Sequence, residues 1–282
     1  MIDQVVKRKI SEMLAEDIGD GDITSNSILK PNARASAEII AKQPGVLAGA
    51  AEAGLAFKQL GVAVKEAQPD GSKTKAGSVV MRLEGPARGI FAGERVALNL
   101  LMRMSGIATA THEMVALAKK KNPRVLVAST RKTAPLLTRL DKWAVVMGGG
   151  ATHRYSLSDH VLIKDGHLKL AGSVGGAVRR AKRAVRWGKV EVEVKTSGEA
   201  LDAVKAGADM VMFDNMAPPE IKKAVKLLES KKLRGRVLLE ASGGINPNNI
   251  EDYAATGVDI VSSSYMTMRA PALDISLEIK KD

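Results

Sequence analysis

Between Val125 and Ser264 the chain has six short apolar runs, and residues able to bind anions lie in or directly after them. Each of the six runs is rich in β-branched residues and contains or ends in polar side chains. Parallel strands of an α/β barrel end on one rim, which is where the active sites of such barrels lie. We therefore expect these side chains to face a common pocket, and their cations indicate an anionic substrate. They are Thr130, Arg131, Lys132, Lys164, Glu193, Asp214, Ser242, Gly243, Gly244, Ser263 and Ser264.

Two groups of cations stand out. Arg131 and Lys132 are adjacent at the end of the first run, and two neighbouring cations are costly to desolvate unless an anion meets them. Arginine grips carboxylate or phosphate with two parallel hydrogen bonds, whereas lysine adds a point charge. His153 and Arg154 follow three glycines and form a second candidate anion site. A basic pair on an ordinary surface and a flexible glycine loop are the simpler alternatives.

Lys164, Glu193 and Asp214 lie at or near successive strand ends. The carboxylates are suited to Mg²⁺, which prefers oxygen ligands and shares them with substrate phosphates. An ion-pair network that closes the barrel is the rival interpretation.

Two further turns resemble phosphate-binding loops. Ser242-Gly243-Gly244 and Ser262–Ser264 follow the last two predicted strands. In α/β barrels the loops after the final strands commonly bind phosphate through backbone amides. We expect these turns to do the same.

Composition narrows the classes of function. The chain has 282 residues, 45% apolar, 26% charged and 3% aromatic, and it has no cysteine. Disulfides, thiolate metal sites, iron–sulfur clusters and cysteine nucleophiles are therefore excluded. The remaining histidines, His112, His160 and His167, show no mutual spacing typical of a metal site. No apolar run approaches the length of a membrane span, so we expect a cytoplasmic protein without a membrane partner.

The formal charge of +12 raises the possibility of nucleic-acid binding. Many of the cations fall in 178–189 and 221–236, where apolar residues recur with helical spacing. Solvated outer helices therefore explain the charge better than a nucleic-acid surface, and we expect no nucleic-acid partner.

The pattern along the chain predicts a small antiparallel sheet followed by β/α units. We expect strands at 35–41, 46–49, 62–67 and 79–84 with a helix at 50–60. A helix at 94–104 should break or bend at Gly106 before a second helix continues to about 121. Six strands should then alternate with helices. The alternating tail at 273–279 reads as a strand that could rejoin the first sheet.

Taken together, the motifs resemble the quinolinate phosphoribosyltransferase family nearly from end to end. The segments that carry the resemblance are Glu16–Thr24, Gly45–Gly49, Glu94–Leu101, Ser105–Thr109, Thr130–Pro135, Lys142–Val145, Gly148–Gly150, His153–Arg154, Leu162–Asp165, Glu191–Val194, Phe213–Met216, Leu239–Ile245 and Leu273–Leu277. Each segment is short, but so many in the same order are highly specific.

The resemblance implies a fold and a reaction. The fold is α/β: a six-stranded α/β barrel of the type II phosphoribosyltransferase kind at 113–268, with an N-terminal open-faced α+β sandwich at 1–112 that the tail at 269–282 rejoins. The reaction joins quinolinate and phosphoribosyl pyrophosphate to give nicotinate mononucleotide, pyrophosphate and CO₂ in NAD biosynthesis. It uses Mg²⁺ and no organic cofactor. The active enzyme is a homo-oligomer, a dimer or a hexamer of dimers, with shared active sites.

The resemblance also implies roles for residues. Those expected to hold quinolinate are Thr130, Arg131, Lys132, His153 and Arg154, with Arg95 from a neighbouring subunit. Lys164 should lie between the substrates. Glu193 and Asp214 should serve the ribose hydroxyls and Mg²⁺ and stabilise positive charge that develops on the ribose. The residues expected around the 5′-phosphate are Ser242, Gly243, Gly244, Ser263 and Ser264. The family commonly has glycine where Ser264 stands, so a Cβ there is expected to narrow the phosphate site.

Four other functions compete with this one. A phosphoribosyltransferase-like paralogue of molybdenum-transport clusters shares much of the barrel pattern, and its substrate is unknown. Nicotinate phosphoribosyltransferase has to bind only one substrate carboxylate, whereas this chain offers two groups of cations. A barrel aldolase would use Lys164 as a Schiff base, but neighbouring Glu193 and Asp214 would favour its charged form. A nucleic-acid binder would leave the strand-end residues unexplained.

Overall fold

The computed structural model describes residues 4–280, which form two compact units. Unit 1 comprises the described residues up to Ala110, the segment Arg139–Gly149 and the residues from Ala270 onward. Unit 2 comprises Thr111–Thr138 and Gly150–Arg269. The predicted domain ranges differ from these units mainly at Arg139–Gly149, and their ends at 1–3 and 281–282 lie outside the described residues.

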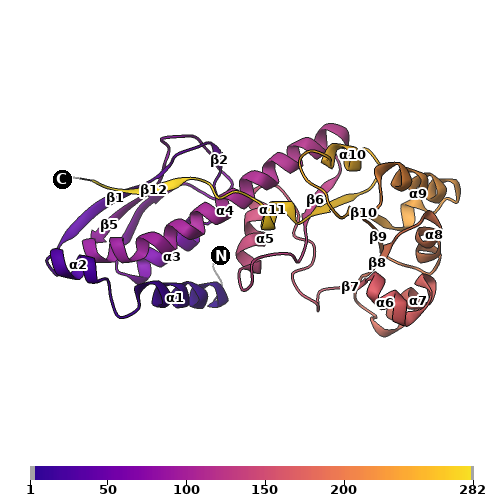
Figure 1. The fold of residues 1–282 in the computed structure, drawn as a ribbon, viewed down its shortest axis with the longest axis horizontal. Helices are drawn as coiled ribbons and strands as arrows, with labels where there is room; N and C mark the ends of the chain where they lie inside the picture. The colour runs from indigo at the N-terminus through magenta and orange to yellow at the C-terminus, as the bar shows by residue number, and fades with distance from the viewer. Residues whose placement is uncertain (1–3, 281–282) are drawn as a thin grey trace. The chain divides into compact units, whose positions relative to one another are not determined.

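Unit 1 is built on a four-stranded antiparallel sheet in the order β12-β1-β5-β3 (Figure 1). The strands are β1 Arg34–Ala41, β3 Ala63–Ala67, β5 Val79–Pro86 and β12 Ile275–Lys280, and a separate pair joins β2 Gly45–Val46 to β4 Lys73–Thr74. The C-terminal strand β12 thus pairs with the first strand of the unit. Inward residues such as Ile39 and Leu83 are buried. The predicted strands at 35–41, 62–67 and 79–84 and in the tail are confirmed, whereas the predicted strand at 46–49 is only Gly45–Val46 in the structure.

The helices of unit 1 are α1 Gln4–Ile18, α2 Ile23–Ile28, α3 Ala50–Gln59, α4 Ala87–Lys121 and α5 Thr138–Met147, and α4 belongs to unit 2 from Thr111 onward. Those other than α2 each bury apolar residues against the unit, whereas α2 leaves Ile23 and Ile28 exposed. Residues Val6, Ile10 and Leu14 of α1 are buried, and Phe57 of α3 is fully enclosed.

The helix does not break at Gly106, because α4 is one continuous helix of 35 residues, so of the predicted break or bend the break is wrong. Glycine at this position allows another segment of the chain to approach the helix backbone closely. A Cβ on Gly106 would lie 2.1 Å from the carbonyl oxygen of Pro271 and 3.0 Å from Cα of Ala272. The chain returning toward β12 therefore packs directly on the helix backbone at this position.

Unit 2 is a six-stranded α/β barrel whose strands are all parallel, in the order β6-β11-β10-β9-β8-β7. The strands are β6 Leu126–Ser129, β7 Val161–Ile163, β8 Val190–Val194, β9 Met210–Asp214, β10 Leu238–Ser242 and β11 Ile260–Ser263. The six predicted strands are thereby confirmed. Ala151 adds an isolated parallel bridge to Ala128 at the β6 edge.

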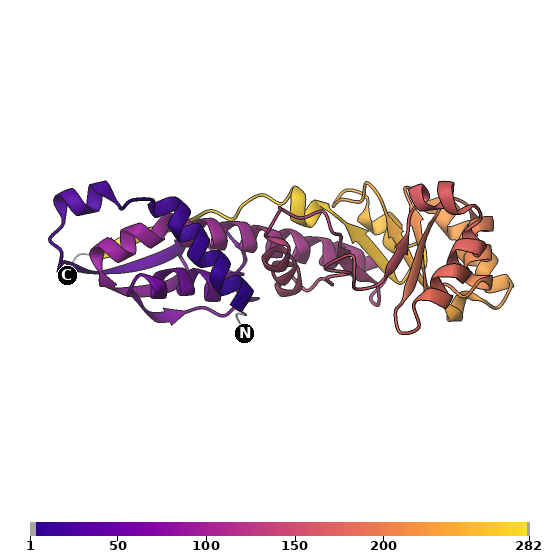
Figure 2. The ribbon, with the colours of Figure 1, turned by 90° about the horizontal axis from the view of Figure 1, so that it is seen from below.

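Helices cover the outer face of this sheet, as Figures 1 and 2 show. They are α6 Asp165–Ala171, α7 Val174–Ala184, α8 Ser197–Lys205, α9 Pro218–Ser230, a 3₁₀ turn Arg234–Arg236, α10 Ile250–Ala254 and α11 Tyr265–Met268. In α9 the residues Ile221, Ala224, Val225 and Leu228 are buried, while the lysines lie on the exposed side. The helical apolar spacing in this basic segment is therefore confirmed. Among residues 4–280 no helix has both the length and the apolar character of a membrane span.

The strands of unit 2 alternate between the two faces of the sheet, with a period of two residues. On β8, Val190, Val192 and Val194 pack into the large core that includes residues of α7, α8 and α9. The intervening Glu191 and Glu193 therefore point to the inner face. The same alternation places Glu240 and Ser242 of β10 on that inner face, so the strands deliver polar side chains to the interior of the barrel.

Candidate active site

Two adjoining cavities lie at the carboxyl ends of the unit 2 strands. The larger has a volume of about 460 Å³ and the smaller about 240 Å³. Thr130, Lys132, Ser242 and Ser262 line both. Because these four residues are shared, the two cavities are adjacent, and we call them two compartments of one site.

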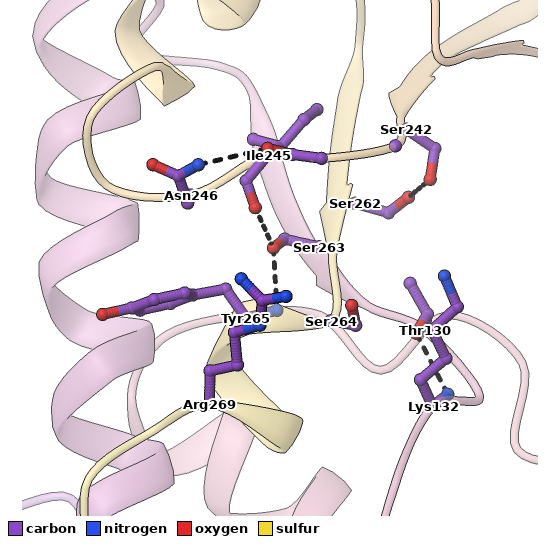
Figure 3. Close-up of a pocket in the computed structure, with 12 residues that line it drawn as sticks. Thr130, Lys132, Ser242, Ile245, Asn246, Ser262, Ser263, Ser264, Tyr265 and Arg269 are labelled. Atoms are coloured by element: carbon purple, nitrogen blue, oxygen red, sulfur yellow. Dashed lines mark hydrogen bonds between the residues drawn. The ribbon is translucent and has the colours of Figure 1, made fainter.

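The smaller compartment is walled by the loops after β10 and β11 (Figure 3). Gly243 and Gly244 both have positive φ angles, +100° and +65°, which glycine adopts without strain. A Cβ on Gly243 would also lie 2.3 Å from Oδ1 of Asn215. The loop can follow this path only if residue 243 is glycine.

Hydrogen bonds hold the rest of this wall. The hydroxyl of Ser263 donates to the carbonyl of Ile245 at 2.6 Å and accepts from the amide of Tyr265 at 3.0 Å (Figure 3). Ser263 therefore ties the two loops together. Ser264 lines the compartment with a φ of −90°, a conformation that needs no glycine. Arg269, just past α11, lines the same compartment and is exposed.

The loop after β6 is fixed from both sides. The hydroxyl of Thr130 accepts from the amide of Lys132 at 3.0 Å (Figure 3). The hydroxyl of Thr267, on α11, donates to the carbonyl of Lys132 at 2.7 Å. The backbone of Lys132 is thus held at the boundary between the two compartments.

Guanidinium groups line the larger compartment. Arg154 is buried and donates to the carbonyl of His160 at 3.3 Å. Burial lowers the pKa of Arg154, and the positive charge of Arg131 lowers it further. Two guanidinium groups that repel each other in this way are stabilised when an anion lies between them.

Carboxylates occupy another part of the larger compartment, which both Glu193 and Asp214 line. Burial raises the pKa of Glu193, and the charges of Asp214 and Asp165 add to this, although the amide of Asp165 and the ammonium of Lys164 oppose it. Nζ of Lys164 lies 3.7 Å from Oε1 of Glu193. The ammonium of Lys164 therefore lies beside the carboxylate of Glu193 in this part of the compartment.

A cluster of buried ionisable groups forms part of the inner face of the barrel. Nε2 of His153 lies 3.3 Å from Oε2 of Glu191 and 3.2 Å from Oε2 of Glu240, and Nε2 of His160 lies 3.1 Å from Oε2 of Glu191. Burial alone would lower the pKa of His153, but the two carboxylates outweigh this and raise it to about 9. Burial raises the pKa of Glu240. His153 and Glu240 also line the larger compartment, so the cluster borders the site.

The chain matches two family models that together span most of its length. These are the quinolinate phosphoribosyl transferase N-terminal domain at residues 22–105 and the corresponding C-terminal domain at residues 107–278. The chain belongs to the quinolinate phosphoribosyltransferase family.

Curated relatives agree with this assignment. The chain is 42% identical to a probable nicotinate-nucleotide pyrophosphorylase [carboxylating] of Methanothermobacter thermautotrophicus, over 96% of this chain and 98% of that protein. It is 41% identical to the human nicotinate-nucleotide pyrophosphorylase [carboxylating], over 86% of this chain and 82% of that protein.

A solved structure is also similar. The nicotinate-nucleotide pyrophosphorylase of Francisella tularensis matches with a TM-score of 0.92 and 36% identity, covering 99% of this chain and 98% of that one. Human nicotinic acid phosphoribosyltransferase shares the fold at a TM-score of 0.61, with 12% identity.

Most residues that the sequence and the family resemblance predicted for the site line the two compartments. The larger holds Thr130, Arg131, Lys132, His153, Arg154, Lys164, Glu193, Asp214 and Ser242, and the smaller adds Gly243, Gly244, Ser263 and Ser264. Arg95 lies elsewhere, exposed on α4 in unit 1.

Several residues in or beside the site were not among the predicted site residues. They are Glu191, Glu240 and His160 in the buried cluster, Asn215 beside Gly243, and Arg269 in the smaller compartment. The alternation of β8 carried a signal for Glu191, which lies two residues before Glu193 and therefore on the same face. Arg269 lies five residues beyond Ser264, and its position as a cation after the last strand was the available signal.

Proposed function

We propose that this site transfers the phosphoribosyl group of phosphoribosyl pyrophosphate to quinolinate, with loss of CO₂, giving nicotinate mononucleotide and pyrophosphate for NAD biosynthesis. The observation that carries the proposal is the adjacency of the two compartments. One is lined by guanidinium groups and the other by a glycine–serine loop pair, and they share Thr130, Lys132, Ser242 and Ser262. The reaction needs two polyanionic substrates side by side, and the site offers that arrangement.

Quinolinate is a pyridine with two adjacent carboxylates, and it fits the larger compartment. Arg131 and Arg154 bring two guanidinium forks to one space, and Lys132 and His153 line the same space. Arginine pairs with carboxylate in a planar, two-bonded geometry that fixes the orientation of the ring. A substrate with a single carboxylate would leave part of this positive charge uncompensated, which supports quinolinate over nicotinate.

Phosphoribosyl pyrophosphate extends from the smaller compartment into the larger one in this proposal. Its 5′-phosphate lies against Ser242, Gly243, Gly244 and Ser264. Ser263 shapes that wall, since its hydroxyl already bonds within the protein. Arg269 adds a cation that the sequence analysis did not include. The ribose then lies in the larger compartment near Glu193 and Asp214.

The chemistry follows from this placement. The pyridine nitrogen forms a bond to C1′ of the ribose as the bond to pyrophosphate breaks, and positive charge develops on the ribose in the transition state. The carboxylates of Glu193 and Asp214 stabilise that charge, and Lys164 balances the anionic substrates between them. The resulting nucleotide loses its 2-carboxylate as CO₂. The electron pair of the breaking bond stays on C2, where the adjacent cationic ring nitrogen stabilises it, and C2 then takes up a proton from water. The protein contributes positioning and electrostatics, and no covalent intermediate is required.

Glu193 and Asp214 also fit a role toward Mg²⁺. Both carboxylates face the compartment, and hard oxygen ligands suit this ion. Mg²⁺ would neutralise charge on the departing pyrophosphate. The proposed reaction uses no organic cofactor.

The active form in this proposal is a homodimer or a larger assembly of dimers. Arg95 is exposed on α4, and Phe91, one turn earlier, is 40% exposed. Residues four apart share a helix face, so an apolar ring and a cation are presented together. We infer that this face meets a second subunit and supplies Arg95 to that subunit's quinolinate compartment.

The test is turnover with purified protein, phosphoribosyl pyrophosphate and Mg²⁺, with quinolinate or nicotinate in parallel reactions. Nicotinate mononucleotide from quinolinate, with little or none from nicotinate, is the expected result. Equal turnover of nicotinate would overturn the substrate assignment. Absence of turnover with both, in folded and oligomeric protein, would favour the molybdenum-cluster paralogue.

A further inference from the structure

A buried threonine on α11 is hydrogen-bonded to loops of both compartments. Thr267 is 3% exposed, and it is not among the described residues that line either compartment. Its hydroxyl donates to the carbonyl of Lys132 at 2.7 Å, across 135 residues of sequence. On the basis of the proposed function, we propose that Thr267 is a positioning residue. It couples phosphate binding in the smaller compartment to quinolinate binding at Lys132 in the larger one.

Both polar groups of the Lys132 backbone are hydrogen-bonded. The amide donates to the hydroxyl of Thr130 at 3.0 Å, within the loop after β6. The carbonyl accepts from Thr267, which belongs to the segment after β11. Bonds on both sides of one Cα restrict the two backbone torsions that set the direction of its side chain. The side chain of Lys132, which lines both compartments, therefore starts from a fixed backbone position.

The opposite side of α11 belongs to the smaller compartment. Tyr265 and Arg269, four residues apart at the two ends of this short helix, line that compartment (Figure 3). Residues four apart share a helix face, whereas the intervening Met266 and Thr267 are buried. One helical turn therefore presents two side chains to the smaller compartment and Thr267 to the loop of Lys132. A phosphate that restrains the first side also restrains the second.

The hydroxyl of Thr267 contacts the loops after β6 and β11 at once. It lies 3.2 Å from the carbonyl of Ser264, which lines the smaller compartment, and 2.7 Å from the carbonyl of Lys132. A hydroxyl has one hydrogen to donate, so the shorter contact is the main bond. Movement of Ser264 changes the geometry of that bond, because both carbonyls accept from the same group. A phosphate that restrains Ser264 should therefore preorganise Lys132 and strengthen quinolinate binding.

Calorimetry with unreactive probes measures this coupling. Phthalate has the two adjacent carboxylates of quinolinate but lacks the ring nitrogen that would attack the ribose, and ribose 5-phosphate supplies the phosphate. We expect phthalate to bind the full-length protein about 2- to 10-fold more tightly when ribose 5-phosphate is saturating, on the order of one hydrogen bond. Thr267→Val removes the hydroxyl at nearly constant volume, and the ratio of the two phthalate Kd values should fall to about 1.

Thr256→Val is the matched control. Thr256 is 4% exposed, and its hydroxyl also donates to a backbone carbonyl, that of Tyr253, at 2.6 Å. It too is absent from the described residues that line the compartments. We expect Thr256→Val to keep the coupling of the unaltered protein. Thr267→Ser retains the hydroxyl and should keep the coupling as well, which a role of the threonine methyl group alone would not allow.

The outcomes separate this proposal from the proposed function. If unaltered protein turns over quinolinate but phosphate does not tighten phthalate binding, or if Thr267→Val keeps the full coupling, the proposal is overturned. Equal loss of coupling in Thr256→Val would also overturn it. If Thr267→Val does not fold, Thr267→Ala replaces it, because alanine removes the hydroxyl without adding a methyl group beside the Lys132 carbonyl. Failure of the proposed function would overturn both proposals and is recognised by absence of turnover and of binding of either probe.

Discussion

A Cβ on Gly243 would lie 2.3 Å from Oδ1 of Asn215, whereas a Cβ on the adjacent Gly244 would meet no atom within 4 Å. Both residues have positive φ angles, so alanine costs about 1–2 kcal/mol of backbone strain at either position. Only Gly243→Ala must also displace Asn215, which adds about 1–3 kcal/mol. We expect Gly243→Ala to lower the free energy of unfolding more than Gly244→Ala. Urea unfolding of the two variants measures this, and equal losses would contradict the prediction.

The neighbouring guanidinium groups of Arg131 and Arg154 lead to a second prediction. Arg131→Ala should raise the KM for quinolinate about 10- to 100-fold, because a charge-assisted hydrogen bond to a carboxylate is worth about 1.5–3 kcal/mol. The KM for phosphoribosyl pyrophosphate should change little. Arg131→Lys should recover only part of the loss, since lysine lacks the two-bonded fork. Steady-state kinetics with each substrate varied in turn measures both constants. A raised KM for phosphoribosyl pyrophosphate with an unchanged KM for quinolinate would contradict the assignment.

Arg269 provides a prediction for the smaller compartment. Arg269→Ala should raise the KM for phosphoribosyl pyrophosphate about 2- to 5-fold, since an exposed ion pair contributes up to about 1 kcal/mol. The effect should shrink as salt is added, because exposed charges are screened. Arg236→Ala removes another exposed arginine in unit 2 and should leave this KM unchanged. If both variants raised this KM equally, the effect would come from the overall positive charge of the protein and not from a contact of Arg269 with the substrate.

The buried carboxylate of Glu193 should lower the stability of the folded protein while it serves the reaction. Burial raises its pKa in the folded protein, so the ionised form is disfavoured by folding and costs stability above that pKa. Glu193→Gln removes this cost, and we expect a higher melting temperature at neutral pH together with a large loss of kcat. The gain should fade as pH falls through the folded pKa, where Glu193 takes up its proton. Glu113→Gln, an exposed substitution on α4, is the control, and a pH-independent gain for Glu193→Gln would contradict the prediction.

The strands and most of the site could be predicted because both depend on local patterns. A period of two residues placed Val190, Val192 and Val194 against the helices and Glu193 on the inner face. Parallel strands then brought their carboxyl ends to one rim. For the same reason Glu191 could have been identified from the sequence.

Other features depend on contacts between distant segments, which no local pattern encodes. His160 and Glu240 meet the same cluster from a loop and from β10, and two histidines seven residues apart in a loop have no periodic signal. Gly106 resembled a helix break because its packing partner, Pro271, lies far along the chain. Likewise, Arg139–Gly149 belongs to unit 1 although the segments on both sides belong to unit 2.

The central claim is that phosphoribosyl transfer to quinolinate precedes and causes loss of its 2-carboxylate. The most direct test uses quinolinate labelled in that carboxylate and follows labelled CO₂, pyrophosphate and nicotinate mononucleotide together. We predict equal amounts of all three products, formed only when phosphoribosyl pyrophosphate is present. Labelled CO₂ without phosphoribosyl pyrophosphate, or pyrophosphate without CO₂, would contradict the account.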